Sequence, residues 1–493
     1  MLIVIASLVL AYVIWTVIRT YATASKLPKG PTPLPFVGNL GTTLTPPFIS
    51  KNLEELRKKY GPVFTFHMPF PVVNIADFDI MKTAMRTDDF SGRVHTPATE
   101  MINYVYNGGI ITSNGDNWRE QRRTTIAILR DFGMGKNRME EMVLLSAREY
   151  LRYLKDKPDL ASIDLRWPIQ LFVANIINEL VFGFRYKYDE CEPLINFVEG
   201  VVRMFELASR SKLFMIHMHI PWIRYIPFIG YHAYYKHKHN FDSLKTYVYR
   251  ETAKAKETYR EDDEPTCFIH AYLKKIPTNS ALSEEQLYNC CHDIFLAGQE
   301  TTSTTLRWAT LFMADNQYVQ DKVREEIFRV VGRDGEPKLA DKNKMPYTTA
   351  TIYELQRRGN IIAVAPNIFR CTTVETEIDG MKIPARTAVN NDLHQVHMTD
   401  PAFVDPDRFW PERYLEEDGV TLKKDLVERT IPFGIGKRLC AGEGLARVEL
   451  FVGLVVTLQH YKILPPDGGS VDLSPLPYNV HLPRQQHLHL VPV

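Results

Sequence analysis

The stretch from about residue 117 to residue 331 limits the fold of this chain more than any other part. Its apolar residues recur at helical spacing, and it shows no repeat, no low-complexity segment and no convincing linker. Residues 283–316 are predicted as one long helix, because Ser283 followed by acidic residues is a capping signal. Residues 445–461 are apolar nearly all round, which is typical of a buried helix.

Strand patterns are short and lie outside this helical stretch, at residues 62–68, 71–76, 374–378, 387–391 and 480–492. A chain of 493 residues would ordinarily form about three domains. Because no boundary is visible, we instead predict one large, mainly α domain with small β-sheets.

The composition, with 45% hydrophobic and 24% charged residues and a net charge of +1, is that of an ordinary globular protein. It argues against disorder, collagen and disulfide scaffolds, and it gives no reason to expect binding to nucleic acid. The cysteines form no C-x-x-C pair and no zinc spacing, which predicts reduced thiols on the cytosolic side of a membrane. They are Cys191, Cys267, Cys290, Cys291, Cys371 and Cys440.

The N-terminal segment predicts that the protein is anchored in a membrane. Residues 2–18 carry no charge and reach the lower limit of length for spanning a bilayer. The positive charges that follow, at Arg19, Lys26 and Lys29, should stay on the cytosolic side. A cleaved signal peptide is the alternative, because residues 22–24 resemble a cleavage site. We expect an anchor at 1–20, a stiff proline-rich connector at 21–40 and one globular domain at 41–493.

Phe433, Gly436, Arg438, Cys440 and Gly442 fit one pattern, F-x-x-G-x-R-x-C-x-G. A lone cysteine is usually a small buried hydrophobe, but this setting suits a thiolate that binds a metal. The glycines let the backbone turn close to the sulfur, and the helix that follows supplies a positive end that lowers the pKa of the thiol. Backbone N–H donors near the sulfur would tune it further.

The pattern resembles the cysteine-ligand signature of cytochrome P-450, the haem-thiolate monooxygenases, and other family motifs follow along the whole chain. Glu354 and Arg357 match E-x-x-R, and Arg413 matches the later arginine motif. These three are expected to form a buried structural network rather than to do chemistry, although E-x-x-R alone would be better explained as a surface pair. Trp118 and Arg122 match W-x-x-x-R, for which a solvated basic helix face is the alternative.

The resemblance implies haem b as the cofactor, with Cys440 as the axial iron ligand. Two positions depart from the family pattern: Asn367 replaces a histidine of other members, and Tyr106 stands where relatives often have arginine. Arginine and tryptophan side chains would face the haem propionates. The residues expected to bind the haem are Cys440, Trp118, Arg122, Arg370, Phe433, Gly436, Arg438 and Ala297.

Residues 297–302 in the long helix match the family's A-G-x-E-T-T. The small residues Ala297 and Gly298 would let a flat cofactor lie against the helix, while Glu300 and Thr301 would pass protons toward bound dioxygen. Alternatively, the Thr301 hydroxyl bonds to the carbonyl four residues earlier and bends the helix. Both can hold together, because a local opening of the helix would accommodate a water.

The resemblance is closest to animal microsomal members of the drug- and steroid-metabolising branch, and an invertebrate source fits. It implies a monooxygenase that inserts one atom of dioxygen into a lipophilic substrate. Electrons would come from NADPH through a flavin reductase, with cytochrome b5 as an optional second partner. The expected location is the endoplasmic reticulum membrane, with a haem-thiolate catalytic domain in the cytosol. At Pro384–Thr387, where relatives have glycine third, we expect only a changed turn.

Two surface segments carry further expectations. Residues 214–235 are aromatic and apolar and are expected to dip into the membrane through Trp222, Tyr225 and Phe228, with ordinary core as the alternative. The second expectation is a basic surface patch that binds an acidic partner, and scattered solvated charge is an equally favoured explanation of the same residues. The patch residues are Arg119, Arg123, Arg130, Lys136, Lys437 and Arg447. Walls of a lipophilic substrate pocket are expected around 95–112, 200–235, 290–302, 362–368 and 474–480.

Two other functions compete with monooxygenation. A haem-thiolate isomerase or dehydratase of oxygenated lipids would need neither reductase nor dioxygen, and such enzymes often lose the pair that Glu300 and Thr301 form here. A non-catalytic haem gas sensor would need neither an apolar entrance nor an acid–alcohol pair. Because this chain carries both features, we rank the sensor last.

Overall fold

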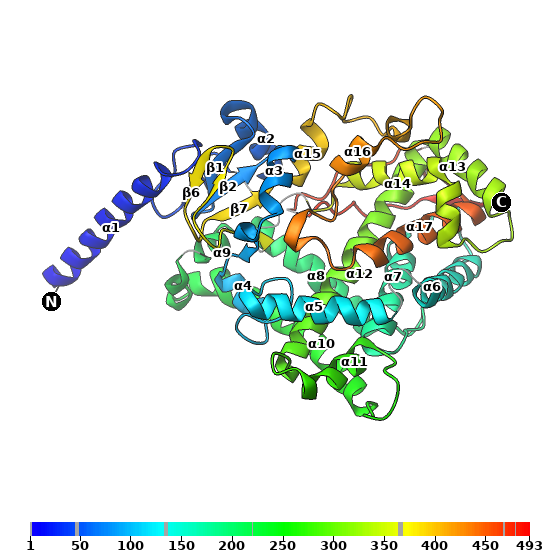
Figure 1. Cartoon of the computed structure of the whole chain (residues 1–493), viewed down its shortest axis with the longest axis horizontal. Helices are drawn as coiled ribbons and strands as arrows, with labels where there is room; N and C mark the ends of the chain where they lie inside the picture. The colour runs from blue at the N-terminus through cyan, green and yellow to red at the C-terminus, as the bar shows by residue number, and fades with distance from the viewer. Residues whose placement is uncertain are drawn as a thin grey trace.

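The computed structural model describes residues 2–44, 49–132, 137–218, 220–362, 368–466, 469–478 and 480–493. Helices make up most of the molecule (Figure 1). They are α1 (Leu2–Ala24), α2 (Ile49–Tyr60), α3 (Phe78–Met85), α4 (Pro97–Ile102), α5 (Gly115–Asp131), α6 (Asn137–Lys155), α7 (Arg166–Phe182), α8 (Glu192–Arg210), α9 (Lys212–His217), α10 (Lys236–Glu257), α11 (Phe268–Lys275), α12 (Glu284–Asp315), α13 (Gln317–Val330), α14 (Pro346–Gly359), α15 (Leu393–Thr399), α16 (Lys424–Arg429) and α17 (Glu443–His460).

The strands form three small sheets. In the largest, β1, β2, β7, β4 and β3 lie side by side in that order, and only β2 and β7 pair in parallel. The other two sheets are the pairs β5–β6 and β8–β9. Every strand region expected from the sequence contains a strand, although 480–492 does so only at its end. The bounds are β1 (Val63–His67), β2 (Pro71–Ile75), β3 (Gly92–Arg93), β4 (Arg370–Cys371), β5 (Thr376–Ile378), β6 (Met381–Ile383), β7 (Ala388–Asn391), β8 (Tyr461–Leu464) and β9 (His489–Pro492).

Helix α12 runs through the centre of the molecule. The Ser283 hydroxyl accepts a hydrogen bond from the Gln286 amide at 3.2 Å, which caps the first turn as expected. The helix then continues for 32 residues and packs against α7, α10, α14 and α17. The single long helix predicted from the sequence is therefore confirmed, and it can carry functional residues from one side of the core to the other.

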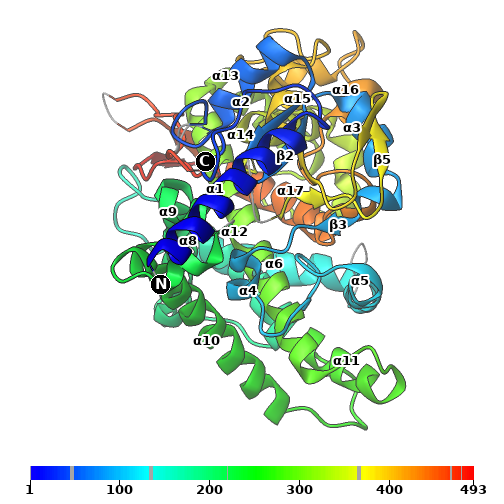
Figure 2. The ribbon, with the colours of Figure 1, turned by 90° about the vertical axis from the view of Figure 1, so that its left-hand side faces the viewer.

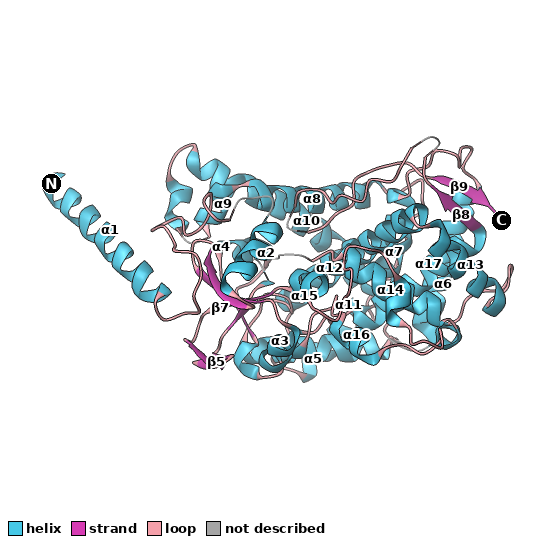
Figure 3. Cartoon of the chain, turned by 90° about the horizontal axis from the view of Figure 1, so that it is seen from above, coloured by secondary structure: helices cyan, strands magenta, loops and turns pink. Residues whose placement is uncertain are grey.

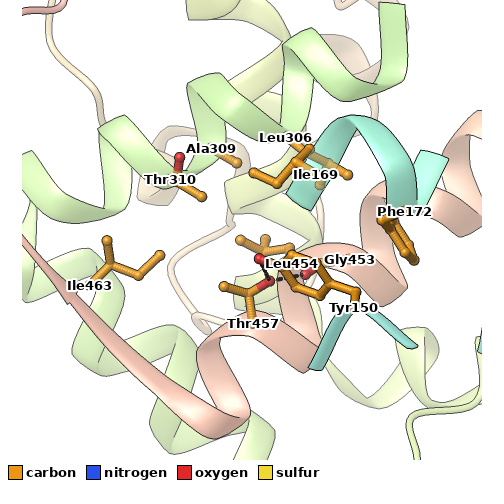
Figure 4. Close-up of a pocket in the computed structure, with 10 residues that line it drawn as sticks. All are labelled: Tyr150, Ile169, Phe172, Leu306, Ala309, Thr310, Gly453, Leu454, Thr457 and Ile463. Atoms are coloured by element: carbon orange, nitrogen blue, oxygen red, sulfur yellow. Dashed lines mark hydrogen bonds between the residues drawn. The ribbon is translucent and has the colours of Figure 1, made fainter. Parts of the chain in front are cut away.

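Helix α17 follows the cysteine loop and is a core helix. Residues 448–459 are all buried, which confirms the prediction from its apolar sequence. A small, almost wholly apolar cavity of about 10 Å³ lies where α17 meets α6, α7, α12 and β8 (Figure 4). It contains none of the candidate site residues, so it is a packing defect of the core rather than the reaction site. Its lining consists of Tyr150, Ile169, Phe172, Leu306, Ala309, Thr310, Gly453, Leu454, Thr457 and Ile463.

Helix α1 projects from the body as a separate arm (Figures 1 and 3), and in Figure 2 it lies in front of the body. Its segment Ala6–Ala24 is long and apolar enough to cross a membrane, and none of it is buried against the body. The helix continues past residue 20, where the anchor was expected to end, to Ala24. Near the middle of the helix the Tyr12 ring packs against the Phe36 ring of the connector, with 6.1 Å between their centres.

Candidate active site

The loop before α17 holds Cys440 in a backbone turn that requires glycine. Gly434 and Gly436 both have φ of 75°, in the left-handed region. At Gly436 a side chain is also excluded, because an added Cβ would lie 1.9 Å from the Met85 carbonyl oxygen. The turn closes with the Cys440 amide donating to the Phe433 carbonyl at 3.0 Å. This geometry presents the sulfur just before α17 begins at Glu443.

The sulfur of Cys440 lies in a mixed electrostatic setting. Burial raises the pKa of its thiol, while hydrogen bonds from the Gly442 and Glu443 backbone and the positive charge of Arg122 oppose that rise. Cys440 nevertheless keeps accessible surface, unlike Cys191, Cys267 and its other buried counterparts. An accessible sulfur enclosed by protein and faced by N–H donors is the arrangement that a metal-binding thiolate needs.

Four guanidinium groups gather beside this loop. Arg438 stacks on the Trp118 ring, with 3.7 Å between its central carbon and the ring centre, and it donates to the Ser91 carbonyl at 2.7 Å and to the Ser113 carbonyl at 2.5 Å. The other three also donate to backbone carbonyls. Their bonds are Arg122 to Leu439 at 2.5 Å, Arg93 to Ile111 at 2.9 Å and Arg370 to Ile435 at 3.3 Å.

The four arginines repel one another. Burial, together with the positive charges of Arg93, Arg370 and Arg122, lowers the pKa of Arg438 to about 7. Burial and Arg122 likewise lower the pKa of Arg93 to about 10. Among the described residues, none of the four forms an ion pair with a carboxylate. Uncompensated cations at this density are stable only with an anion between them.

The same place holds unused hydrogen-bond donors. Within the described ranges, Arg370 Nη1 and Trp118 Nε1 are buried and have no partner. Donors and positive charges therefore converge beside an accessible cysteine, and a haem would use both features, its two propionates bonding to the arginines and tryptophan. The residues present fit this cofactor.

Arg93 is the site residue that the sequence reasoning missed. It lies on β3, directly opposite Arg370 on β4. Like charges at opposed positions of a strand pair are unfavourable, so the pairing itself indicates an anionic ligand. Tyr106, by contrast, is 81% exposed and stacks on His95, outside the arginine cluster. Asn367 and most of the expected pocket wall at 362–368 lie outside the described residues.

On α12, the Thr301 hydroxyl donates to the Ala297 carbonyl at 2.8 Å, which is the back-bonded alternative considered above. Glu300 is buried, and its Oε1 accepts from Thr304 Oγ1 at 3.2 Å while its Oε2 has no partner among the described residues. Burial raises the pKa of Glu300 to about 7, and Arg307 and Arg166 counteract part of that effect. Glu300 can thus hold and release a proton near neutral pH.

The expectation that Ala297 and Gly298 face the cofactor stays a prediction, and at Gly298 the structure shows a packing contact. An added Cβ at Gly298 would lie 2.8 Å from Ile177 Cδ1, so this glycine admits close packing of α7. Consecutive helical residues point about 100° apart, so Gly298 and Ala297 face different neighbours. Ala297 remains exposed, on a different side of the helix.

Glu354, Arg357 and Arg413 come together in a buried network. Arg357 binds both carboxylate oxygens of Glu354 at 2.8 Å, and Arg413 Nε reaches Oε1 at 3.2 Å. The Trp410 amide adds a bond to Oε1 at 2.9 Å, and the carbonyls of His397 and Pro406 accept from Arg357. The single carboxylate bonds to both guanidinium groups and backbone carbonyls accept from Arg357, so the network can fix the loop that leads from α15 toward the cysteine turn.

The candidate basic patch is largely paired. Arg119 lies 2.7 Å from Asp116, Arg123 lies 2.8 Å from Glu120, and Lys437 lies 3.4 Å from Asp88. Arg447 pairs with Glu443 in the same way, Arg130 forms no described ion pair, and Lys136 lies outside the described residues. Scattered, paired charge therefore describes this surface better than a free basic patch.

Comparison with known proteins agrees with this geometry. The sequence model of the cytochrome P450 family matches residues 28–491, and the chain belongs to this family. Among its relatives, cytochrome P450 2H2 of Gallus gallus is 34% identical over 96% of this chain and 95% of its own length. Cytochrome P450 2C1 of Oryctolagus cuniculus is 35% identical over 92% and 91%, and cytochrome P450 2U1 of Homo sapiens is 32% identical over 94% and 90%.

Family membership confirms the resemblance drawn from the motifs and the expected mainly α fold with small sheets. The chain is an oxidoreductase of the cytochrome P450 monooxygenase class, with an iron-containing haem held by a cysteine thiolate. The family match does not by itself say which residues serve the haem.

Proposed function

We propose that this protein is a membrane-anchored monooxygenase that inserts one atom of dioxygen into a lipophilic organic substrate, with electrons supplied from NADPH through a flavin reductase. The observation that carries the proposal is the set of four arginines that have no acidic partner in the described parts of the chain and lie beside an accessible cysteine. When bound, the haem supplies dioxygen activation, which the axial thiolate favours by donating electron density.

Cys440 is the proposed iron ligand. Arg93, Arg122, Arg370 and Arg438, together with Trp118 Nε1, are proposed to hold the two propionates. Gly436 permits the turn that positions the sulfur. The Phe433 carbonyl accepts a hydrogen bond from the Cys440 amide, and the Phe433 ring centre lies 5.1 Å from the central carbon of the Arg447 guanidinium. Glu354, Arg357 and Arg413 keep a structural role, and residues 41–493 form the catalytic domain.

Glu300 and Thr301 are proposed to handle protons. The raised pKa of Glu300, about 7, lets it bind and release a proton near neutral pH, and its Oε2 is free of protein partners in the described structure. Thr301 Oγ1 donates to the Ala297 carbonyl one turn earlier in the helix. We infer that Thr301 exchanges this bond for a water or a substrate oxygen and so orients the proton that Glu300 supplies.

The membrane and partner assignments belong to the same proposal. Segment Ala6–Ala24 would cross the endoplasmic reticulum membrane, with Lys26 and Lys29 holding the body on the cytosolic side. Residues 214–235 would form a second contact, since Trp222, Tyr225 and Phe228 are 53%, 70% and 89% exposed. His219 lies outside the described part of this segment. A flavin reductase and cytochrome b5 would approach from the cytosol.

Substitution of Thr301 tests the reaction class. In Thr301→Ala we expect unchanged haem content and an unchanged spectrum of the reduced carbon monoxide complex. Product formed per NADPH should fall and hydrogen peroxide should rise, because the proton supply is disordered. General acid–base groups contribute about 10²- to 10⁴-fold, and we expect the low end because water can replace the hydroxyl. Glu300→Gln should act in the same direction.

The assignment of Cys440 is checked in the same preparation. Cys440→Ala should remove the thiolate-specific Soret shift of the reduced carbon monoxide complex, and survival of the shift would contradict the assignment. Unchanged coupling in both α12 variants would remove the reason for choosing oxygen activation. Turnover without NADPH, dioxygen or reductase would favour the isomerase or dehydratase instead, and binding without any turnover would favour the gas sensor.

A further inference from the structure

The loop from Tyr104 to Ser113 lies between α12 and the arginine cluster. On the α12 side, the amides of Ile110 and Ile111 donate to Asp293 Oδ2 at 2.6 and 2.9 Å. On the opposite side, the Ile110 carbonyl accepts from Arg438 Nη1 at 3.3 Å, and the Ile111 carbonyl accepts from Arg93 Nε at 2.9 Å. Both residues thus bond in both directions.

Asp293 is 1% exposed and forms no ion pair with any described cation. Its carboxylate accepts from the amides of Ile110 and Ile111. The peptide group between Ile110 and Ile111 therefore bonds at both ends, through its N–H to Asp293 and through its carbonyl to Arg438. The next carbonyl, that of Ile111, accepts from Arg93. Burial raises the pKa of Asp293 to about 7, while the Ile111 and Ile110 amides favour its charged form. Hydrogen bonds in series polarise one another, and the negative charge that Asp293 carries when ionised, opposite in sign to the guanidinium groups, strengthens that effect in a poorly hydrated interior. The segment therefore carries attraction between Asp293 and the arginines across the loop.

The backbone is shaped for this contact. Gly109 has φ of 71°, and an added Cβ would lie 2.3 Å from Asp293 Oδ2. Its lack of a side chain lets the carboxylate reach the two amides that follow. Asp293 Oδ1, in contrast, is buried and has no described partner, so all of the carboxylate's hydrogen bonding goes to this segment.

We propose that Asp293 is a positioning residue that acts through the peptide groups of Ile110 and Ile111 to hold Arg93 and Arg438 in place for the haem carboxylates. This rests on the proposed function, which assigns those arginines to the haem. The consequence is a coupling between the substrate pocket and the haem site. The loop expected to form part of the pocket wall also provides the hydrogen bonds that hold Arg93 and Arg438 for the cofactor.

The same loop contains a matched control. Asn289, one turn before Asp293 on α12, is fully buried, and its Oδ1 accepts from the amides of Tyr104 and Val105 at 3.0 and 3.1 Å. The Val105 carbonyl accepts from the Gly108 amide within the loop. Asn289 Nδ2 donates to Asn103 Oδ1, which also accepts from Thr112 Oγ1, and among the described residues neither bond involves an arginine. Asn289 therefore anchors the first half of the loop to α12 without contacting the arginine cluster.

The test measures haem transfer from the full-length haem-loaded protein to excess apomyoglobin, together with hydrogen exchange of the loop amides. Asp293→Leu should speed haem transfer about tenfold, in line with the loss of hydrogen bonds to a charged group. Asp293→Asn, which keeps an acceptor but no charge, should give a smaller acceleration of the same sign. In both, exchange should rise at Ile110 and Ile111.

Asn289→Leu should raise exchange at Tyr104 and Val105 while haem transfer stays within about twofold of the wild type. Suppose that the wild type shows the thiolate carbon monoxide band and that both Asp293 variants transfer haem at the wild-type rate. This result would overturn the proposed coupling but leave the proposed function standing. A wild type without that band would instead contradict the proposed function. If Asp293→Leu fails to fold, the comparison of Asp293→Asn with Asn289→Leu decides the question.

Discussion

At the scale of single residues, the molecule places ionisable groups where burial opposes their charge. Glu300 illustrates this on the acidic side. Its pKa is raised to about 7 by burial, against an ordinary value of 4.5, although Arg307 and Arg166 favour the charged form. A carboxyl in this state is well suited to deliver protons, and it also affects the stability of the fold.

The stability of the protein should therefore depend on pH through Glu300. Between about pH 4.5 and 7 the folded state keeps a proton that the unfolded chain has released, so the free energy of unfolding falls as pH rises. Glu300→Gln removes this term. We expect the variant to match the wild type near pH 5 and to gain stability over it by on the order of 2–3 kcal/mol at pH 8.

Unfolding in urea followed by circular dichroism at pH 5, 6, 7 and 8 would measure this difference. Other buried carboxyls, such as Asp293 and Asp392, are present in both proteins and cancel in the comparison. If the free energy of unfolding changes with pH in the same way for both proteins, the pKa of Glu300 is not raised in the folded state.

The same scale shows what sequence can predict. Cys440, Trp118 and Arg122 stand in short contiguous motifs, so their residue types and spacing are enough to indicate a haem. Arg93 stands in no such motif, and its role depends on the pairing of β3 with a strand far along the chain. Asp293 likewise acquires its partners only when the loop folds onto α12.

At the scale of elements, the turn between β6 and β7 shows how a departure from the family pattern is accommodated. Arg386 occupies the position where the family pattern led us to expect glycine, and its φ is 61°, in the left-handed region that glycine favours. The Arg386 amide donates to the Thr372 carbonyl at 2.8 Å, and the Thr387 amide donates to Thr372 Oγ1 at 2.9 Å. These bonds hold the turn and leave strain at Arg386.

Arg386→Gly should stabilise the protein by about 0.5–1 kcal/mol, because it relieves the left-handed strain but also frees the unfolded chain. Arg386→Ala is the control, since it removes the exposed side chain and keeps the Cβ. The two thermal midpoints, measured by circular dichroism, should separate, with glycine higher. Equal midpoints would mean that the turn stores no strain.

Elements were predicted well where one pattern extended over many residues. Helices α12 and α17 are examples, because their caps and apolar faces are local properties. Region 480–492 was predicted less well, since only His489–Pro492 pairs with β8. Strand formation there depends on a partner that the apolar pattern cannot specify.

At the scale of the whole molecule, the two candidate membrane elements lie at one end (Figures 1 and 3). Phe36 connects them. It packs against Tyr12 of α1 and against the small apolar cluster of Ile220, Ile223 and Ala233. The anchor and the exposed aromatic segment can therefore meet a bilayer together.

Deletion of residues 2–24 should leave the protein peripherally associated with membranes, because Trp222, Tyr225 and Phe228 remain exposed. The truncated protein should sediment with microsomes at low salt and be released in part by washing. Adding Trp222→Ser and Phe228→Ser to the truncation should release it fully. Complete release on truncation alone would contradict a second contact. If the protein is expressed from its complete sequence and the mature membrane-bound form starts near Ser25, this would contradict a retained anchor.

The four arginines around the cysteine turn have a consequence for the amount of protein in a cell. Their mutual repulsion is a cost that the folded chain carries until an anionic ligand reaches them. A ligand that binds only the folded state adds stability that grows with the logarithm of its concentration. With haem as that ligand, its supply sets how long a newly made chain survives quality control, so cofactor synthesis and protein abundance rise and fall together.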